Sequence, residues 1–141
     1  MKLLHNISFG MLWGLGKVLG ALPLKMQHAL ADFLYVIIYH VAHYRVKVTR
    51  MNLKNAFPNK SEAERLMIEK KFYRHLATLF IEDIAMVAFS AETMRKRFIY
   101  ENLDEFLKMN DRRTVIAAMS HFGNWEYSSV FSLVNPHPIL A

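Results

Sequence analysis

Two long apolar stretches near the N-terminus limit what this chain of 141 residues can fold into. The first covers residues 7–24 and contains one charged residue, Lys17, and the second covers residues 29–42. Neither offers a charge-free run of about 20 residues, the length of a membrane-spanning helix. Both predict helices that are separated at Pro23, because the residue before a proline avoids the helical conformation. The sequence therefore predicts that residues 1–44 form apolar helices associated with a membrane.

Positive charge is concentrated in the same part of the chain. Residues 1–60 contain eight lysines and arginines but one acid, Asp32, whereas residues 61–141 contain ten against eleven. Cations that flank apolar stretches are typical of a membrane surface, while nucleic-acid binders carry them on a polar face interleaved with aromatic residues. We therefore expect a membrane partner and no nucleic acid. The predicted membrane contacts are Trp13, Lys17, Arg45, Lys47 and Arg50.

Two other interpretations of the N-terminal segment are open. It resembles a signal peptide, with Lys2 before an apolar segment at residues 7–15 and a small-residue exit at residues 18–20. Against cleavage, Lys17 lies beside that exit, and the sequence beyond it is still basic and apolar. In the second interpretation both stretches are buried core helices of a soluble protein. Retained membrane association is the interpretation that we expect.

Helical signals continue through the middle of the chain. Ser61 and Glu64 form a capping box, a hydroxyl N-cap followed three residues later by a carboxylate, and predict a helix that ends near Phe89. Large apolar residues at helical spacing make the stripe of that helix: Phe72, Leu76, Leu79, Phe80 and Met86. The other elements predicted before residue 110 are helices over 44–57, 91–97 and 102–109 and a short strand over 98–100.

An apolar run of strand length, residues 114–120, follows the turn residues 110–113. Such a run is typical of a strand buried on both faces, as in a parallel sheet. A helical stretch to Leu133 follows, and residues 139–141 suggest the opening of a second strand. This order predicts an α/β fold in which the sheet is incomplete, and assigns residues 45–141 to that domain.

The candidate catalytic pair is His121 and Glu126, at the end of the predicted strand. On a single helix the two side chains would lie about 140° apart, facing away from each other. They can converge if His121 lies in a loop and Glu126 lies in the first turn of the next helix. Gly123 permits a tight turn between them, and Asn124 is a good N-cap for that helix. Strand ends in α/β sheets are also where ligands bind.

A histidine beside a carboxylate suits general base catalysis. A neutral imidazole, with an ordinary pKa of about 6.5, is available as a base, and a carboxylate on its other ring nitrogen fixes the tautomer. The chain has no cysteine, and Ser120 lies within the predicted strand, so we predict direct activation of a substrate hydroxyl. Backbone N–H groups near Gly123 and Asn124 can stabilise an oxyanion, which makes these the candidate substrate-binding residues.

No metal site and no cofactor is expected. Without cysteine there is neither a disulfide scaffold nor a thiolate metal site. His40 and His43 stand three residues apart on a predicted helix, but no third ligand follows at a useful spacing.

The segment HFGNWE at residues 121–126, after a hydrophobic run, resembles a motif of the lysophospholipid acyltransferase-like superfamily. More narrowly, the chain resembles the lipid A biosynthesis (lauroyl/myristoyl) acyltransferases of Gram-negative bacteria. Two further segments agree: RMNLKNAFP at residues 50–58 is similar to the family's Arg-x-Asn-Leu…Phe-Pro segment, and a helix begins at residues 61–64. The resemblance covers the N-terminal half of such an enzyme.

The resemblance implies an enzyme at the cytoplasmic face of the cell inner membrane. It would move a fatty acyl chain from acyl carrier protein to a hydroxyl of a lipid A precursor. In the family the histidine of the His-x4-acid motif is the general base and the acid orients it, which corresponds to His121 and Glu126 here. The family's later segments, an arginine-containing substrate-binding segment and the rest of the sheet, are not among these residues, so the activity of this chain alone is open.

Two alternatives to that function are also open. One is an acyltransferase with another lipid acceptor, either a glycerophospholipid or a mannosyl lipid. The other is a membrane-bound protein without catalytic activity, in which the HFGNWE segment is accidental. The residues do not select the acceptor or the acyl chain length, nor do they distinguish acyl carrier protein from coenzyme A as the donor.

Overall fold

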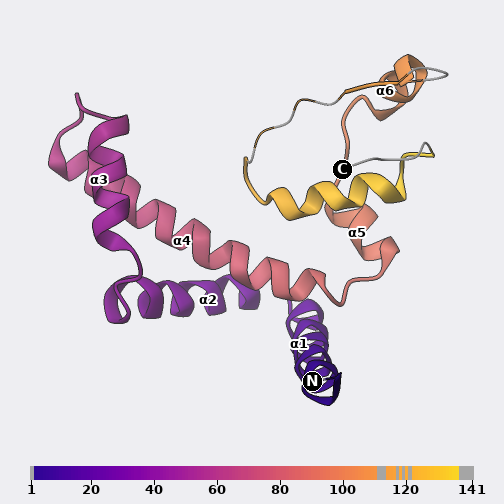
Figure 1. Cartoon of the computed structure of the whole chain (residues 1–141), viewed down its shortest axis with the longest axis horizontal. Coiled ribbons are helices and arrows are strands. Elements are labelled where there is room, and N and C mark those ends of the chain that lie inside the picture. The colour runs from indigo at the N-terminus through magenta and orange to yellow at the C-terminus, as the bar shows by residue number, and fades with distance from the viewer. Residues whose placement is uncertain (1, 111–113, 117, 119, 121, 137–141) are drawn as a thin grey trace. The chain divides into compact units, whose positions relative to one another are not determined.

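The computed structural model describes residues 2–110, 114–116, 118, 120 and 122–136, without the side chains of residues 2–5 and 110 (Figure 1). The chain divides into two compact units, Met1–Ala88 and Phe89–Ala141. The first contains α1 (Lys2–Ala21), α2 (Leu24–Tyr35), the π-helix η1 (Val36–Val41), α3 (Val46–Ala56) and α4 (Glu62–Met86). The second contains α5 (Ala91–Arg97), α6 (Leu103–Asn110) and the 3₁₀-helix η2 (Trp125–Leu133).

Local sequence signals set most of the helix boundaries as predicted. α1 and α2 are separated at Pro23, and α3 ends before Pro58. The capping box is present, because the Ser61 hydroxyl accepts from the Glu64 N–H at 3.3 Å and the Glu64 carboxylate accepts from the Ser61 N–H at 2.8 Å. These two bonds satisfy N–H groups that would otherwise lack partners at the start of α4.

The predicted fold class is wrong. In the described ranges the regular structure is helical, and no strand forms in residues 98–100 or in the described part of 114–120. Residues 139–141 lie outside the described residues. A strand requires a neighbouring strand to pair its backbone groups, and no described segment supplies one. The predicted fold class also placed membrane-associated helices at the N-terminus, and none of the described helices is long and apolar enough to cross a bilayer.

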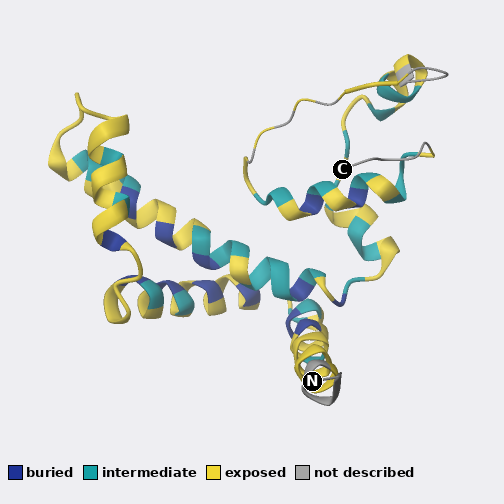
Figure 2. Ribbon diagram, viewed as in Figure 1, coloured by how far each residue is buried: buried dark blue, intermediate teal, exposed yellow. Residues whose placement is uncertain are grey.

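The 25-residue helix α4 organises the first unit. α2 runs along it, α3 contacts its N-terminal half, and α1 packs near its C-terminal end (Figures 1 and 2). The buried stripe of α4 differs from the predicted one, because Phe72 and Phe80 are 44% and 45% exposed. The buried positions are Glu69, Tyr73, Ala77 and Ala85. Alanine lets neighbouring helices approach closely, so small residues line the contact while larger ones remain outside.

α1 packs against the end of α4 through a glycine. A Cβ atom at Gly16 would lie 2.6 Å from the Ile84 carbonyl oxygen and 3.2 Å from the Cβ of Ala88. The turn between α1 and α2 is fixed by the buried Gln27, whose amide nitrogen donates to the carbonyls of Leu19 at 2.9 Å and Leu22 at 3.0 Å. The side chain of Gln27 thereby satisfies carbonyl groups at the C-terminal end of α1.

Replacing Gly16 by alanine is therefore expected to lower the free energy of unfolding by about 1–3 kcal/mol, because the new methyl group meets backbone that cannot rotate away. Gly14→Ala is the matched control, since nothing lies within 4 Å of its Cβ position. There alanine should raise the stability by about 0.5–1 kcal/mol through its higher helix propensity. Urea denaturation followed by circular dichroism measures both values; equal changes for the two variants would contradict the close packing of α1 on α4.

Candidate active site

Residues 122–124 form a turn that leads into η2. His121 lies outside the described residues, so the structure does not test its convergence with Glu126. The Phe122 N–H donates to the Ser120 carbonyl at 3.0 Å, and Gly123 has a φ of +65°, a conformation that other residues rarely adopt. The Asn124 side-chain oxygen accepts from the Glu126 N–H at 3.1 Å. The predicted tight turn, N-cap and first-turn position of Glu126 are confirmed.

η2 is a 3₁₀-helix, and its exposure pattern repeats every three residues. Glu126, Ser129 and Ser132 are exposed, whereas Tyr127 and Val130 are buried. Side chains three residues apart are aligned in a 3₁₀-helix, so the exposed residues form a single row. The hydroxyls in this row donate to backbone carbonyls three residues earlier, from Ser129 to Glu126 at 2.8 Å and from Ser132 to Ser129 at 2.7 Å. Glu126 begins this row with its side chain in solvent.

An aromatic cluster holds the opposite side of η2. Tyr127 stacks on Phe98, with ring centroids 5.8 Å apart and planes within 7°. Phe131 makes edge contacts with Tyr100 at 5.3 Å and Phe106 at 5.4 Å. Edge-to-face and offset stacked pairs are the favoured arrangements of aromatic rings. Two residues of the predicted strand 98–100, Phe98 and Tyr100, therefore provide a packing surface for the helix that carries Glu126.

Two hydrogen bonds attach η2 to the segment around α5. The Tyr100 hydroxyl donates to the Ser128 carbonyl at 3.2 Å, and burial raises the pKa of Tyr100 above its usual value of 10.0. Arg95 donates to the Leu133 carbonyl at 2.8 Å. A cation at the C-terminal end of a helix is favourable because the last carbonyls carry partial negative charge. These contacts and the aromatic cluster fix the backbone on which Glu126 is displayed.

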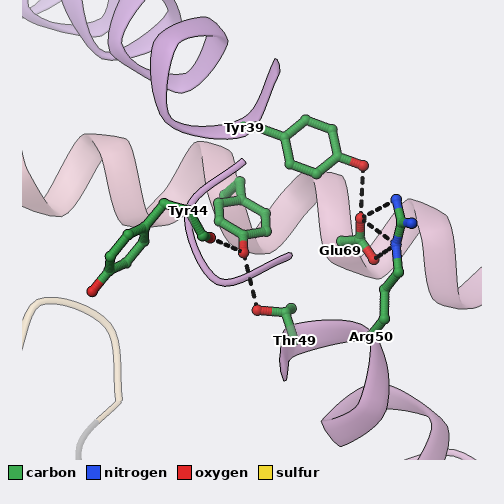
Figure 3. A network of polar contacts seen from close by, with 6 residues as sticks. Tyr39, Tyr44, Thr49, Arg50 and Glu69 are labelled. Carbon is green, nitrogen blue, oxygen red and sulfur yellow. Dashed lines mark hydrogen bonds and ion pairs between the residues drawn. The ribbon is translucent and has the colours of Figure 1, made fainter. Parts of the chain in front are cut away.

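A second polar cluster, which the sequence did not predict, lies in the first unit around Glu69 (Figure 3). The Glu69 side chain is 2% exposed and accepts from the Tyr39 hydroxyl at 2.7 Å. Arg50 donates to the same carboxylate through Nε at 3.0 Å and Nη2 at 3.2 Å. The bond to Glu69 raises the pKa of Arg50 above its usual range. This cluster ties η1 and α3 to α4.

A neighbouring set of hydrogen bonds fixes the loop between η1 and α3 (Figure 3). The Tyr73 hydroxyl donates to the Tyr44 carbonyl at 2.6 Å and lies 3.1 Å from the Thr49 hydroxyl. His43 and Arg45, on either side of Tyr44, have φ values of 49° and 53°. Left-handed conformations are unfavourable for residues other than glycine, and these bonds help to hold the loop in place.

The predicted membrane contacts lie on different elements. Lys17 Nζ lies 5.1 Å from the centre of the Trp13 ring on α1, which is a cation–π contact. Arg45 and Lys47 are exposed at the start of α3, and Arg50 is shared between solvent and Glu69. None of these positions tests membrane contact, which stays a prediction. In the described part of the chain, no three histidine, aspartate or glutamate residues are grouped so that they could hold a metal ion.

The Tyr39–Glu69 contact predicts a dependence of stability on alkaline pH. Burial and, next, the hydrogen bond to Glu69 raise the pKa of Tyr39 above its usual value of 10.0. Above pH 10 the unfolded chain loses the phenol proton while the folded protein keeps it, so the free energy of unfolding falls as the pH rises towards the folded-state pKa. Tyr39→Phe should make this fall shallower. The free energy of unfolding of both proteins is measured by urea denaturation from pH 9 to pH 11, about one unit below and above the usual tyrosine pKa of 10.0. Parallel slopes for the two proteins would refute the prediction.

The second unit displays the Glu126 side chain on a turn that Asn124 caps, five residues after His121 in the sequence. In a comparison with known families, the family model of the bacterial lipid A biosynthesis acyltransferases matches residues 2–141. The chain therefore belongs to the bacterial lipid A biosynthesis acyltransferase family. No curated protein and no solved structure matches the chain.

Proposed function

We propose that the protein transfers a fatty acyl chain from acyl carrier protein to a hydroxyl of a lipid A precursor, with His121 as general base and Glu126 as the residue that orients it. The observation that carries the proposal is the presentation of Glu126. Its side chain is exposed in the first turn of η2, five residues after the histidine, on a turn that Gly123 and Asn124 define. Family membership supports the acyl transfer and the lipid A precursor.

The proposed reaction needs one base and no covalent enzyme intermediate. The imidazole of His121 takes the proton of the acceptor hydroxyl as its oxygen attacks the thioester carbonyl carbon. The tetrahedral intermediate then collapses, the carbon–sulfur bond breaks, and the proton on His121 passes to the departing thiolate. The Glu126 carboxylate stabilises the imidazolium between these steps, as a carboxylate does in other histidine-dependent acyl transfers. Backbone N–H groups around Gly123 and Asn124 are the proposed oxyanion donors.

We also propose that the enzyme acts at the cytoplasmic face of the inner membrane. The support lies on α1, where Trp13 is 47% exposed and carries Lys17 against its ring. An amphipathic aromatic ring beside a lysine suits the boundary between lipid headgroups and acyl chains. Several large apolar side chains on the same helix are also exposed: Ile7, Phe9, Met11, Leu12, Leu15 and Val18.

The experiment that tests the function is direct transfer by the purified full-length protein. It is incubated with fatty acyl carrier protein and a lipid A precursor, and the product is analysed by mass spectrometry. The proposal expects the acceptor to gain the mass of one acyl chain. Parallel reactions offer a glycerophospholipid as acceptor and acyl coenzyme A as donor. Transfer only to the glycerophospholipid would overturn the proposed acceptor, and transfer only from coenzyme A would overturn the proposed donor.

A further inference from the structure

One flank of α3 carries a row of cations. Lys47, Arg50 and Lys54 are spaced three and four residues apart, so they lie within about 60° of one another around the helix axis. All three are exposed. The adjacent flank, about 100° away around the helix axis, contacts the rest of the unit through Val46, Thr49 and Leu53, which are buried or half-buried. We call Lys47, Arg50 and Lys54 the basic row.

Acidic residues do not balance this row. The sequence contains no aspartate or glutamate from residue 33 to residue 61. On α4, Glu69 contacts the row, but its carboxylate is buried and already bonded to Arg50 and Tyr39. In the loop after α3 and the first turn of α4, Lys60 and Glu64 pair with each other at 3.9 Å. Lys47 and Lys54 therefore present their charge outward.

The cations at the beginning of α3 are unfavourable for the helix itself. Arg45 occupies the N-cap position and Lys47 lies in the first turn, where the helix dipole disfavours positive charge. The N-cap side chain of Arg45 also makes no capping hydrogen bond. Residues that disfavour the local helix are expected at positions that serve function rather than folding.

The basic row fits a charged protein surface better than a bilayer. Helices that lie in a membrane interface bury a wide apolar face among the lipids. In α3 the apolar residues Val46 and Leu53 pack within the unit, and Val48 and Met51 are the large apolar side chains that α3 leaves exposed among polar and basic residues. The exposed apolar side chains of the first unit are most numerous on α1, which carries two lysines, Lys2 at its start and Lys17, and no arginine.

We propose that the basic row is a docking surface for an acidic protein face, and that in the proposed reaction this partner is the acyl carrier protein. The inference rests on the proposed function for the identity of the partner. The inference adds the surface that receives the carrier protein. This surface is a helix flank that can align its cations with carboxylates on the partner. Complementary charges of this kind accelerate association and fix orientation.

The test compares donors of different size. In the full-length protein, Lys47→Glu/Lys54→Glu should raise KM for acyl carrier protein about tenfold, because two attractions become repulsions. The rate with an acyl-pantetheine thioester, which has no protein surface, should not change. Increasing ionic strength should raise the wild-type KM for the carrier protein and reduce the difference between the proteins. Arg50 is left in place because it bonds to Glu69.

The matched control is Lys70→Glu/Lys71→Glu, which reverses two exposed charges on α4 and should leave both rates unchanged. An unchanged KM for the carrier protein in Lys47→Glu/Lys54→Glu would overturn the proposal. So would equal losses with both donors, or a loss confined to binding of vesicles that contain anionic phospholipid. If the wild type transfers nothing, the proposed function fails, and fluorescence anisotropy of labelled carrier protein still decides whether the row binds it.

Discussion

Replacing His121 by alanine is expected to reduce the rate of acyl transfer by about 10²- to 10⁴-fold, the usual contribution of a positioned general base. Without the imidazole, the acceptor hydroxyl must attack the thioester while it still holds its proton. The measurement is the rate of transfer from acyl carrier protein at saturating donor, with product quantified by mass spectrometry. Folding is followed by circular dichroism and membrane binding by vesicle sedimentation, and both should match the wild type.

Two companion variants separate the roles of the pair. Glu126→Gln keeps the shape of the side chain but removes its charge, so it should reduce the rate less than loss of His121 and shift the pH profile of the rate. His75→Ala changes another exposed histidine, on α4, and should leave the rate unchanged. A His121→Ala protein that retains wild-type activity would eliminate the proposed base, and equal losses for His75→Ala would show that the effect is not specific.

Replacing Arg50 by methionine is expected to lower the free energy of unfolding by about 2–3 kcal/mol. The substitution leaves the carboxylate of Glu69, which is 2% exposed, with the Tyr39 hydroxyl and without its cation. Removing one partner of a fully buried ion pair costs about 3–5 kcal/mol. The expected value is smaller because the Arg50 side chain is 61% exposed, so water already screens the pair. Urea denaturation at neutral pH measures the change.

A double-mutant cycle tests whether that loss arises from the pair. Arg50→Met/Glu69→Met should be less destabilised than the sum of the single variants, because no uncompensated buried charge remains. The control is the exposed pair of Lys96 and Glu92, joined at 2.6 Å with both side chains at least 74% exposed. Lys96→Met should cost no more than about 0.5 kcal/mol. Similar losses for Arg50→Met and Lys96→Met would contradict the structural role of the Glu69 cluster.

Helix boundaries were predictable because they depend on neighbours in the sequence. Pro23 and Pro58 restrict their own backbones and the residues before them, and Ser61 and Glu64 complete each other's hydrogen bonds within one turn. The sheet was predicted wrongly for the opposite reason. An apolar run such as 114–120 indicates that side chains can be buried, but a strand also requires a second segment to pair with it.

The same distinction applies to the candidate site. The turn at Gly123 and the cap at Asn124 were predictable, since both depend on a few consecutive residues. The packing of Phe98 and Tyr100 under η2 was not, because aromatic residues have high strand propensity and their partners lie almost 30 residues later. Glu69 was missed because a single acid within a long helix usually faces solvent.

The π-helix η1 has a consequence for how this chain tolerates changes of length. At its end the Ala42 N–H donates to the Ile37 carbonyl, five residues earlier, at 2.8 Å, and this wider turn accommodates more residues than a turn of α-helix. Because a π-turn contains about one residue more than an α-turn, deleting one residue between Val36 and Val41 would let the segment relax into regular α-helix while α2 and the loop that leads to α3 keep almost the same relative orientation. The same deletion within α2 would rotate everything beyond it by about 100°, so the π-helix is the stretch that should tolerate the loss of a residue best.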